Sequence, residues 1–163
     1  MLQDMMAHRD RSRTGNEIAA LPMRWSSNGT LHVLMVTARG SGRWVMPKGW
    51  RFDGGTPWKT AETQALDRAG VVGHVGINPI GRYSYDRIMP DGAVMTCDVE
   101  VFPMVVERLR SDWKNRRTRK RRWFEVSAAA SQVNEPELAA LLRTLSVKPP
   151  KRTARAWFLS WFD

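Results

Sequence analysis

Three polar side chains stand at helical spacing just after a glycine-containing loop: Gln64, Asp67 and Arg68. In an α-helix, residues three and four positions apart share one face, so these side chains should point to a common region. Grouped carboxylates bind hard divalent cations such as Mg²⁺, but only Asp67 is an anion here. Arg68 is a permanent cation that opposes a metal ion and can hold a phosphate group instead. The set therefore allows a sparse metal site or a phosphate-binding site.

The segment around these residues has clear helix-boundary signals. Thr56 can cap the first turn, and Pro57 suits the first helical position because its missing N–H is no loss there. Gly70 is typical of a helix end. Trp58 shares a face with Ala61, Ala65 and Ala69, which predicts that it packs in the core. Glu62 is about 200° of helical rotation from Gln64 and cannot replace it.

Hydrophobic alternation and turn signals predict strands on both sides of this helix. The pairs Asn28-Gly29 and Asp91-Gly92 favour hairpin turns, and a capping-box-like entry at residues 134–137 precedes a leucine stripe that should pack on the sheet. We expect strands at residues 17–25, 31–38, 44–47, 80–88, 94–106 and 122–126, and a last helix through Leu138, Leu141, Leu142 and Leu145. This order predicts an α+β fold with a mixed sheet covered by helices.

Length and composition indicate a single domain. The chain has 163 residues, 42% of them hydrophobic, which is enough for a core without disulfides. No apolar run approaches the roughly 18 residues of a membrane span, the N-terminus lacks the features of a signal peptide, and Cys97 is the single cysteine. We expect a flexible N-terminus (1–14), a globular domain (15–146), a basic and aromatic tail (147–163) and a cytoplasmic setting.

Positive charge is the strongest global signal. Lysine and arginine number 26 against 16 acidic residues, for a formal net charge of +10. Residues 107–122 hold nine basic and two acidic side chains. Such a segment attracts polyanions, including nucleic acids, polyphosphates and acidic membrane surfaces. Trp113 and Trp123 bracket its basic end, a pattern typical of single-stranded RNA sites, although a solvated loop has the same composition.

The tail carries an aromatic pattern of its own. Trp157, Phe158, Trp161 and Phe162 would form one face if residues 153–163 are helical. With the lysines and arginines before it, such a helix could lie on a membrane surface. We favour burial against the domain itself or in a homodimer, and expect no membrane association.

The stretch from Trp44 to Gly73 resembles the signature of the Nudix superfamily. The opening Trp44–Gly49 and the close Ala69-Gly70-Val71 keep the signature's spacing without a gap. Beyond this box, residues 81–85, 99–102 and 121–124 resemble bacterial Nudix proteins akin to diphosphoinositol polyphosphate phosphohydrolases. The resemblance extends from about residue 17 to residue 145 and implies an α/β/α sandwich with a mixed β-sheet.

The resemblance also implies a chemistry, in which a metal-activated water attacks a phosphoanhydride with Mg²⁺ or Mn²⁺ as cofactor. Gln64, Asp67 and Arg68 occupy the positions at which the family carries its glutamate cluster. Thr63 and Gly55 replace a further arginine and glutamate of the signature. The remaining metal ligands would be Asp67 and the Gly49 carbonyl, with Asp98 or Glu100 as possible additions, while substrate contacts would come from Arg39, Lys48, Trp50 and Arg82.

We therefore expect a protein that recognises a diphosphate-containing ligand, such as a nucleoside diphosphate linked to another group, a dinucleoside polyphosphate or an inositol pyrophosphate. Because the box carboxylates are replaced, hydrolysis should be weak or lost, and the protein could work without a metal. Two alternatives stay open: a non-catalytic nucleotide or polyphosphate sensor, and an RNA-binding module that uses residues 107–122. Lys48 and Arg39 could equally be solvated loop cations. His8, His32 and His74 lack metal-ligand spacing.

Overall fold

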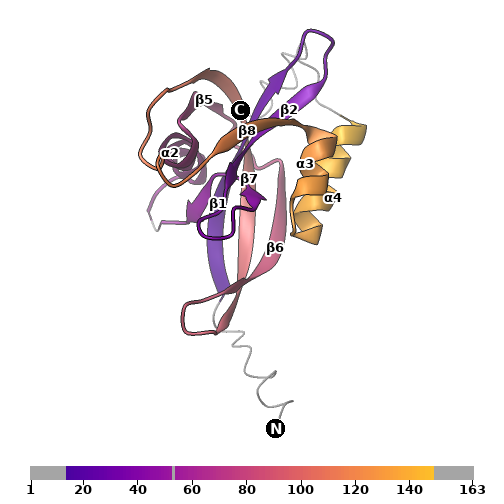
Figure 1. The fold of residues 1–163 in the computed structure, drawn as a ribbon. Helices are drawn as coiled ribbons and strands as arrows, with labels where there is room; N and C mark the ends of the chain where they lie inside the picture. The colour runs from indigo at the N-terminus through magenta and orange to yellow at the C-terminus, as the bar shows by residue number, and fades with distance from the viewer. Residues whose placement is uncertain (1–13, 53, 149–163) are drawn as a thin grey trace.

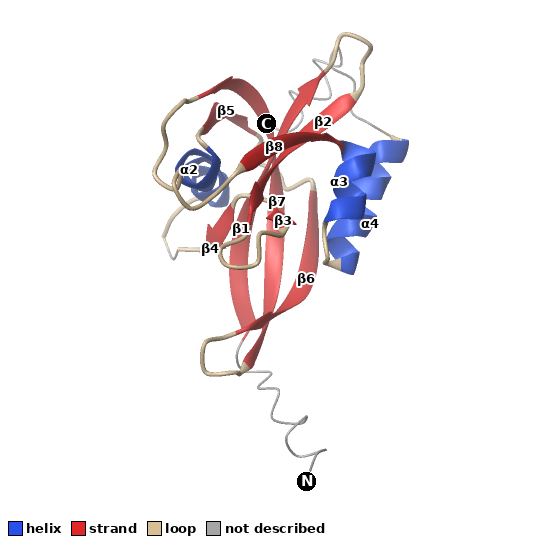
Figure 2. Ribbon diagram, viewed as in Figure 1, coloured by secondary structure: helices blue, strands red, loops and turns tan. Residues whose placement is uncertain are grey.

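The computed structural model describes residues 14–52 and 54–148, which form one mixed β-sheet with helices on both faces (Figures 1 and 2). The strands are β1 (Thr14–Trp25), β2 (Leu31–Thr37), β3 (Trp44–Val45), β4 (Lys48–Trp50), β5 (Val71–Val75), β6 (Gly81–Ile88), β7 (Val94–Leu109) and β8 (Arg121–Glu125). The helices are α2 (Pro57–Ala69), α3 (Val126–Gln132) and α4 (Pro136–Val147). The predicted α+β sandwich with a mixed sheet is confirmed.

The sheet is built around the long strands β1 and β7, which pair in parallel with Thr14 opposite Thr96 and Met23 opposite Val105. All other pairings are antiparallel: β2 and β4 pair with β1, β5 and β6 with β7, and β3 and β8 with β2. The two predicted hairpins join β1 to β2 and β6 to β7, and each turn contains a glycine with positive φ, Gly29 or Gly92.

Successive side chains of β1 point to opposite faces of the sheet, so the core has two layers. Ala19, Leu21 and Met23 belong to the cluster beneath α3 and α4, whereas Ile18 and Ala20 belong to the cluster beneath α2. Figure 1 shows α2 on one side of the sheet and α3 and α4 on the other. The final helix packs through the predicted leucine stripe.

Several sequence-based expectations need correction. The strands β4 and β5 and the helix α3 were not predicted, because each is short and defined by its partner in the fold. The strand β7 continues to Leu109 because it pairs with β5. Helix α2 begins and ends as predicted, but the Thr56 side chain makes no capping hydrogen bond. The helix entry at residues 134–137 also lacks a side-chain cap.

Two of the expected segments, the N-terminus and the tail, lie mostly outside the described residues. Strand β1 starts at Thr14 and α4 ends at Val147. The predicted flexible N-terminus, apart from Thr14, and the aromatic tail from residue 149 lie outside the described residues. No helix among the described residues combines the length and apolar character that a bilayer crossing requires.

Candidate anion-binding site

A cavity of about 550 Å³ opens where β4, the end of α2, the β2–β3 loop and β6 meet. Its charged lining is unequal, with six basic and three acidic side chains. The basic ones are Arg39, Arg43, Lys48, Arg68, Arg87 and Arg119, and the acidic ones are Glu17, Asp86 and Glu135. We call it the main cavity. Its lining suits an anionic ligand.

Three arginines from distant parts of the sequence meet at this cavity. Arg39 follows β2, Arg68 lies in the last turn of α2, and Arg119 precedes β8. Burial and then the neighbouring Arg39 lower the pKa of Arg68. Burial, followed by Arg68 and Arg39, lowers the pKa of Arg119 to about 10. The three guanidinium groups, named here the arginine cluster, therefore repel one another and would gain from a bound anion.

Gln64 positions Arg68 beneath the glycine of the loop. The Arg68 Nε–H donates to Gln64 Oε1 at 2.6 Å, and Gln64 itself is buried. Gly49 passes so close that a Cβ added there would lie 2.5 Å from Gln64 Nε2. Position 49 must therefore be glycine, because any side chain there would displace the Gln64 amide.

A second group of polar contacts holds Lys48. Its Nζ donates to both carboxylate oxygens of Glu17, at 3.0 and 3.2 Å, and to the Tyr85 hydroxyl at 2.6 Å. The Tyr85 hydroxyl in turn donates to Glu17. Glu17 is only 3% exposed, and burial, followed by the hydrogen bond to Glu17, raises the pKa of Tyr85. Lys48 is therefore a fixed, partly neutralised cation.

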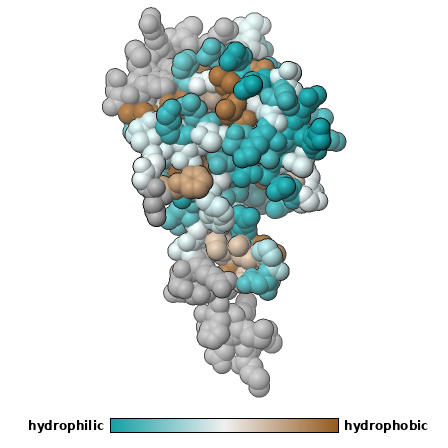
Figure 3. Space-filling view, turned by 90° about the vertical axis from the view of Figure 1, so that its left-hand side faces the viewer, coloured by the Kyte–Doolittle hydropathy of each residue, from teal (hydrophilic) through white to brown (hydrophobic). Residues whose placement is uncertain are grey.

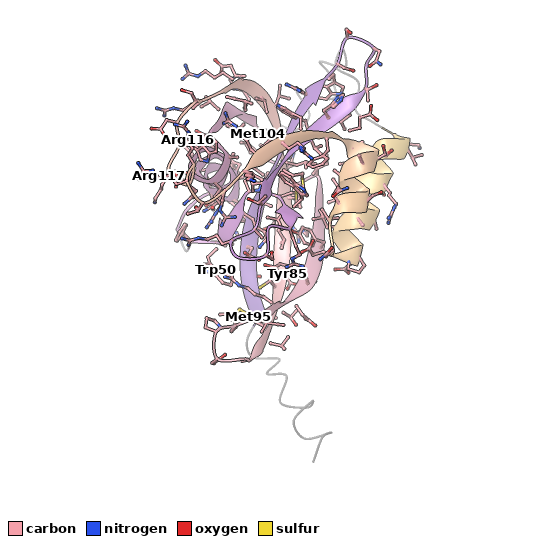
Figure 4. All side chains as sticks on the ribbon, in the orientation of Figure 1. Trp50, Tyr85, Met95, Met104, Arg116 and Arg117 are labelled. Atoms are coloured by element: carbon pink, nitrogen blue, oxygen red, sulfur yellow. The ribbon has the colours of Figure 1, made fainter. Side chains whose placement is uncertain are left out.

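Trp50 lines the main cavity, and Figure 4 shows it on the same part of the molecule as Tyr85. Its side chain is 39% exposed, and the Arg87 guanidinium carbon lies 5.1 Å from the ring centroid. Its ring packs against Gly15, where an added Cβ would lie 2.5 Å from the indole. The indole therefore packs against Gly15 and is partly exposed to solvent.

The other predicted site residues lie elsewhere. Arg82 pairs with Glu100 at 3.0 Å, and both line a separate cavity of about 490 Å³ with Asp98. Asp67 does not line the main cavity. Its backbone carbonyl accepts a hydrogen bond from the Asn115 N–H at 3.0 Å. The structure thus brings together Arg39, Lys48, Gly49, Trp50, Gln64 and Arg68, but not Asp67 or Arg82.

These residues do not fit a divalent metal cluster. Within residues 14–52 and 54–148, no group of three or more histidine, cysteine or acidic side chains is placed to hold a metal ion. Of the helix positions, Gln64 supplies its amide oxygen to Arg68, and Arg68 brings a cation to the cavity.

The basic segment folds back over α2 and is partly structural. Arg121 lies over the Trp113 ring, and Arg24 over the Trp123 ring, each at 4.1 Å from the centroid. These faces are therefore already covered by side chains of the same chain. Arg116 and Arg117 project from the loop beside α2 (Figure 4), and hydrophilic residues dominate much of that face (Figure 3).

Sequence reasoning missed Glu17, Tyr85 and Arg119 as site residues. One signal was present for Glu17: it is an acidic residue on the same strand face as Ala19, Leu21 and Met23, which form core. Tyr85 was placed correctly on one face with Tyr83, but nothing local linked it to Lys48. Arg119 belongs to the basic segment predicted as a possible polyanion contact, but nothing local linked it to Arg68, because only the return of the 110–120 segment brings the two together.

No protein-family model matches this chain. Its sequence is 31% identical over 102 residues to Nudix hydrolase 12, mitochondrial, of Arabidopsis thaliana, covering 61% of this chain and 50% of that protein. It is 24% identical over 116 residues to Nudix hydrolase 16, mitochondrial, of the same plant, covering 68% of this chain and 62% of that one. The chain thus spans between half and two thirds of the length of these curated relatives.

Solved structures share the fold. A NUDIX hydrolase from Nitrosomonas europaea superimposes with a TM-score of 0.63 at 15% identity, over 82% of this chain and 89% of that one. The Caenorhabditis elegans Ap4A hydrolase gives 0.59 at 16% identity, over 82% and 97%. The NUDIX domain of Shewanella oneidensis NrtR, solved with ADP ribose, gives 0.58 at 12% identity, over 88% and 97%.

Proposed function

We propose that the chain is a protein of the Nudix superfamily and that it binds a diphosphate-containing ligand in the main cavity without a divalent metal, hydrolysing it weakly or not at all. The observation that carries this proposal is the arginine cluster, in which Arg68 stands at a position where the family has a carboxylate. We also propose a cytoplasmic setting for the protein.

Guanidinium groups suit such a ligand because they bind phosphate oxygens through paired, charge-assisted hydrogen bonds. Arg68 is oriented by Gln64, and Arg119 by its hydrogen bond to the Thr37 carbonyl at 3.0 Å. Lys48 is held between Glu17 and Tyr85 at the same cavity. Donors fixed before binding lose little conformational entropy when the ligand arrives.

The organic part of the ligand has several candidates. The solved relatives include an Ap4A hydrolase and a domain complexed with ADP ribose, and the sequence resembles diphosphoinositol polyphosphate phosphohydrolases. Trp50, which is 39% exposed and lines the cavity, offers an aromatic surface to a nucleobase or a sugar ring. We therefore propose nucleoside diphosphate derivatives first, with dinucleoside polyphosphates and inositol pyrophosphates as the other members of the class.

Binding of inorganic pyrophosphate, measured calorimetrically in EDTA and again with Mg²⁺ or Mn²⁺, tests the proposal. We expect binding in EDTA, with Arg68→Ala and Arg119→Ala each reducing affinity about tenfold or more. The matched control is Arg143→Ala, which removes an exposed arginine of α4 that lines no part of the main cavity. Binding that requires metal, or that survives both cavity substitutions, would contradict it.

Hydrolysis is tested separately by phosphate release from nucleoside diphosphate derivatives, dinucleoside polyphosphates and inositol pyrophosphates. We expect little or no turnover. Robust metal-dependent turnover that is abolished by Asp67→Ala would overturn this part of the proposal, because it would mean that Asp67 and the Gly49 carbonyl still form a working metal site.

A second candidate function is contact with a longer polyanion, RNA or polyphosphate, through the basic segment. The observation in its favour is that Arg39 lines both the main cavity and a neighbouring cavity of about 790 Å³ formed by residues 112–118. Lys114, Arg116 and Arg117 line this second cavity. An RNA affinity that falls steeply with salt, and is lost on neutralising residues 116–122, would support it.

A further inference from the structure

Two cation–aromatic pairs line the main cavity, one beyond the other. Lys48 and Trp50 are two residues apart on β4, and Tyr85 and Arg87 are two residues apart on β6, so each strand presents its two side chains on one face. Lys48 Nζ lies 4.7 Å from the Tyr85 ring centroid, and the Arg87 guanidinium carbon lies 5.1 Å from that of Trp50. Two residues of a strand span about 7 Å. The pair Trp50–Arg87, called here the outer pair, extends the cationic lining by about that length.

The two cations are held in different ways. Lys48 donates to both carboxylate oxygens of Glu17 and to the Tyr85 hydroxyl, and its side chain is only 17% exposed. Arg87 is exposed and rests over the Trp50 ring. An aromatic ring attracts a cation without neutralising it as a carboxylate does. The contact that holds Arg87 therefore leaves its charge for a ligand.

Arg87 stands at one end of the cavity's positive charge. Burial lowers the pKa of Arg68 most, Arg39 follows, and Arg87 adds a smaller effect of the same sign. The cations that lower the pKa of Arg119, after burial, are Arg68 and Arg39. By these effects Arg87 lies nearer to Arg68 than to Arg119. The cations thus extend along the cavity from Arg119, past Arg68, to the outer pair.

The outer pair has the chemistry of a phosphate contact. A guanidinium can stack on an aromatic ring with its face while its edge binds phosphate oxygens through paired hydrogen bonds. Arg87 can therefore keep its contact with Trp50 when an anion binds. The cavity, of about 550 Å³, is within the range that takes a drug-sized ligand, roughly 300–1,000 Å³. It has room for more than the diphosphate assigned to the arginine cluster.

We propose that Arg87 binds a phosphoryl group beyond the diphosphate held by the arginine cluster, with Trp50 as the platform that positions it, so that the ligand carries at least three phosphoryl groups. The inference rests on the proposed function for the other two phosphoryl groups. It makes Arg87 a specificity-determining residue and Trp50 a positioning residue. Within the proposed ligand class it selects the members that bear a further phosphate, whatever organic group carries it.

Inorganic tripolyphosphate and pyrophosphate, compared by calorimetry in EDTA, test the role of Arg87. We expect the wild type to bind tripolyphosphate at least tenfold more tightly. Arg87→Ala should lower tripolyphosphate affinity about tenfold and change pyrophosphate affinity less than about twofold. The control Arg143→Ala also removes one exposed positive charge, but outside the cavity, so it measures the effect of net charge alone. An equal loss for both probes, or an equal loss in the control, would overturn the inference.

Trp50→Leu tests the platform, because inorganic probes have no ring that could stack on the indole. We expect it to lower tripolyphosphate affinity severalfold and to cause no further loss when combined with Arg87→Ala. Trp50→Phe keeps an aromatic ring and should retain most of the affinity. Additive losses in the double variant, or an equal loss in Trp50→Phe and Trp50→Leu, would refute the positioning role of Trp50.

The two inorganic probes also separate this inference from the proposed function. Pyrophosphate binding with no preference for tripolyphosphate would refute only the role of Arg87. Failure to bind pyrophosphate in EDTA would refute the proposed function.

Discussion

Gly49 determines how Arg68 is presented, because its backbone passes directly over the Gln64 amide. The packing leaves no room for a methyl group, and the Gln64 amide is committed to Arg68 by a hydrogen bond of 2.6 Å. The glycine is therefore needed for close approach. Its φ does not lie in the left-handed region.

Gly49→Ala should displace the Gln64 amide and release Arg68. We expect pyrophosphate affinity to fall about tenfold, equivalent to about 1.4 kcal/mol, as measured by calorimetry. Gly55→Ala is the matched control, because an added Cβ there meets nothing nearer than 3.9 Å. Equal affinities of the two variants would show that Gln64 does not position Arg68.

The arginine cluster should lower stability in the absence of ligand. The pKa of Arg119 in the folded protein is about 10, against an ordinary value of 12.5. Between these values the unfolded chain holds more protons, so the contribution of this group to the free energy of unfolding rises with pH. Below about pH 10 the charged, crowded guanidinium is destabilising.

Arg39→Ala should therefore weaken pyrophosphate binding and raise the melting temperature of the free protein by about 1–2 °C, since it removes an exposed charge that repels Arg68 and Arg119. Thermal denaturation with and without pyrophosphate measures both effects. A lower melting temperature together with unchanged affinity would show that Arg39 is a structural residue.

At the scale of the element, α2 carries Gln64 and Arg68 at positions where the Nudix resemblance implies carboxylates. The backbone of the helix is regular between Pro57 and Gly70. The proposed absence of a metal site therefore concerns side-chain type alone. Carboxylates placed at these two positions should create cation binding.

The double variant Gln64→Glu, Arg68→Glu should bind Mg²⁺ or Mn²⁺, seen as a metal-dependent rise in melting temperature that the wild type lacks. It should also lose metal-free pyrophosphate binding. Lys59→Glu with Thr63→Glu makes the same change in charge on the exposed face of α2 and serves as control. If the first variant responds to metal no more than the control, this helix face is not the site.

The pairing of β5 with β7 depends on a second glycine. At the register shift between Val72 and Gly73, a Cβ on Gly73 would collide with the Val105 backbone carbonyl. Backbone cannot rotate away as a side chain can. This edge strand, β5, follows directly from α2 in the chain.

Gly73→Ala should destabilise the protein by about 3 kcal/mol, measured by urea unfolding. Gly55→Ala is again the control, with a change within about 0.5 kcal/mol. A small effect at Gly73 would mean that the β5–β7 register relaxes without loss.

At the scale of the whole molecule, basic side chains extend beyond the main cavity. Arg39 connects this cavity to the one formed by residues 112–118. Arg116 and Arg117 project there from the loop (Figure 4). A long polyanion could contact both cavities, whereas pyrophosphate fits one.

Arg116→Ala with Arg117→Ala should therefore weaken binding of single-stranded RNA and reduce its salt dependence, log affinity against log salt, by about 1.4, if each arginine contacts one phosphate. Pyrophosphate affinity should not change. Arg143→Ala with Lys59→Ala, two exposed cations outside both cavities, is the control. An unchanged salt dependence would exclude the loop from polyanion binding.

Local signals in the sequence determined much of the fold. The boundaries of α2, the two hairpin turns and the leucine stripe of α4 were predicted correctly because each depends on residues within a few positions of one another. The resemblance of the loop to the Nudix signature predicted one site for Arg39, Lys48, Gly49, Trp50 and Arg68, and their role in ligand binding stays a prediction. The sequence by itself also determined the positive charge and the scarcity of carboxylates on the helix face.

Only the tertiary structure decided which charges meet. Glu17 and Lys48 are 31 residues apart, Arg119 reaches Arg68 through the return of the 110–120 segment over α2, and Glu135 enters from the start of α4. Conversely, Asp67 and Arg82 lie outside the main cavity. The spacing of residues along the sequence does not predict these contacts between charged side chains. They depend on strand order and on the path of the loops, which are set by packing of the whole sheet.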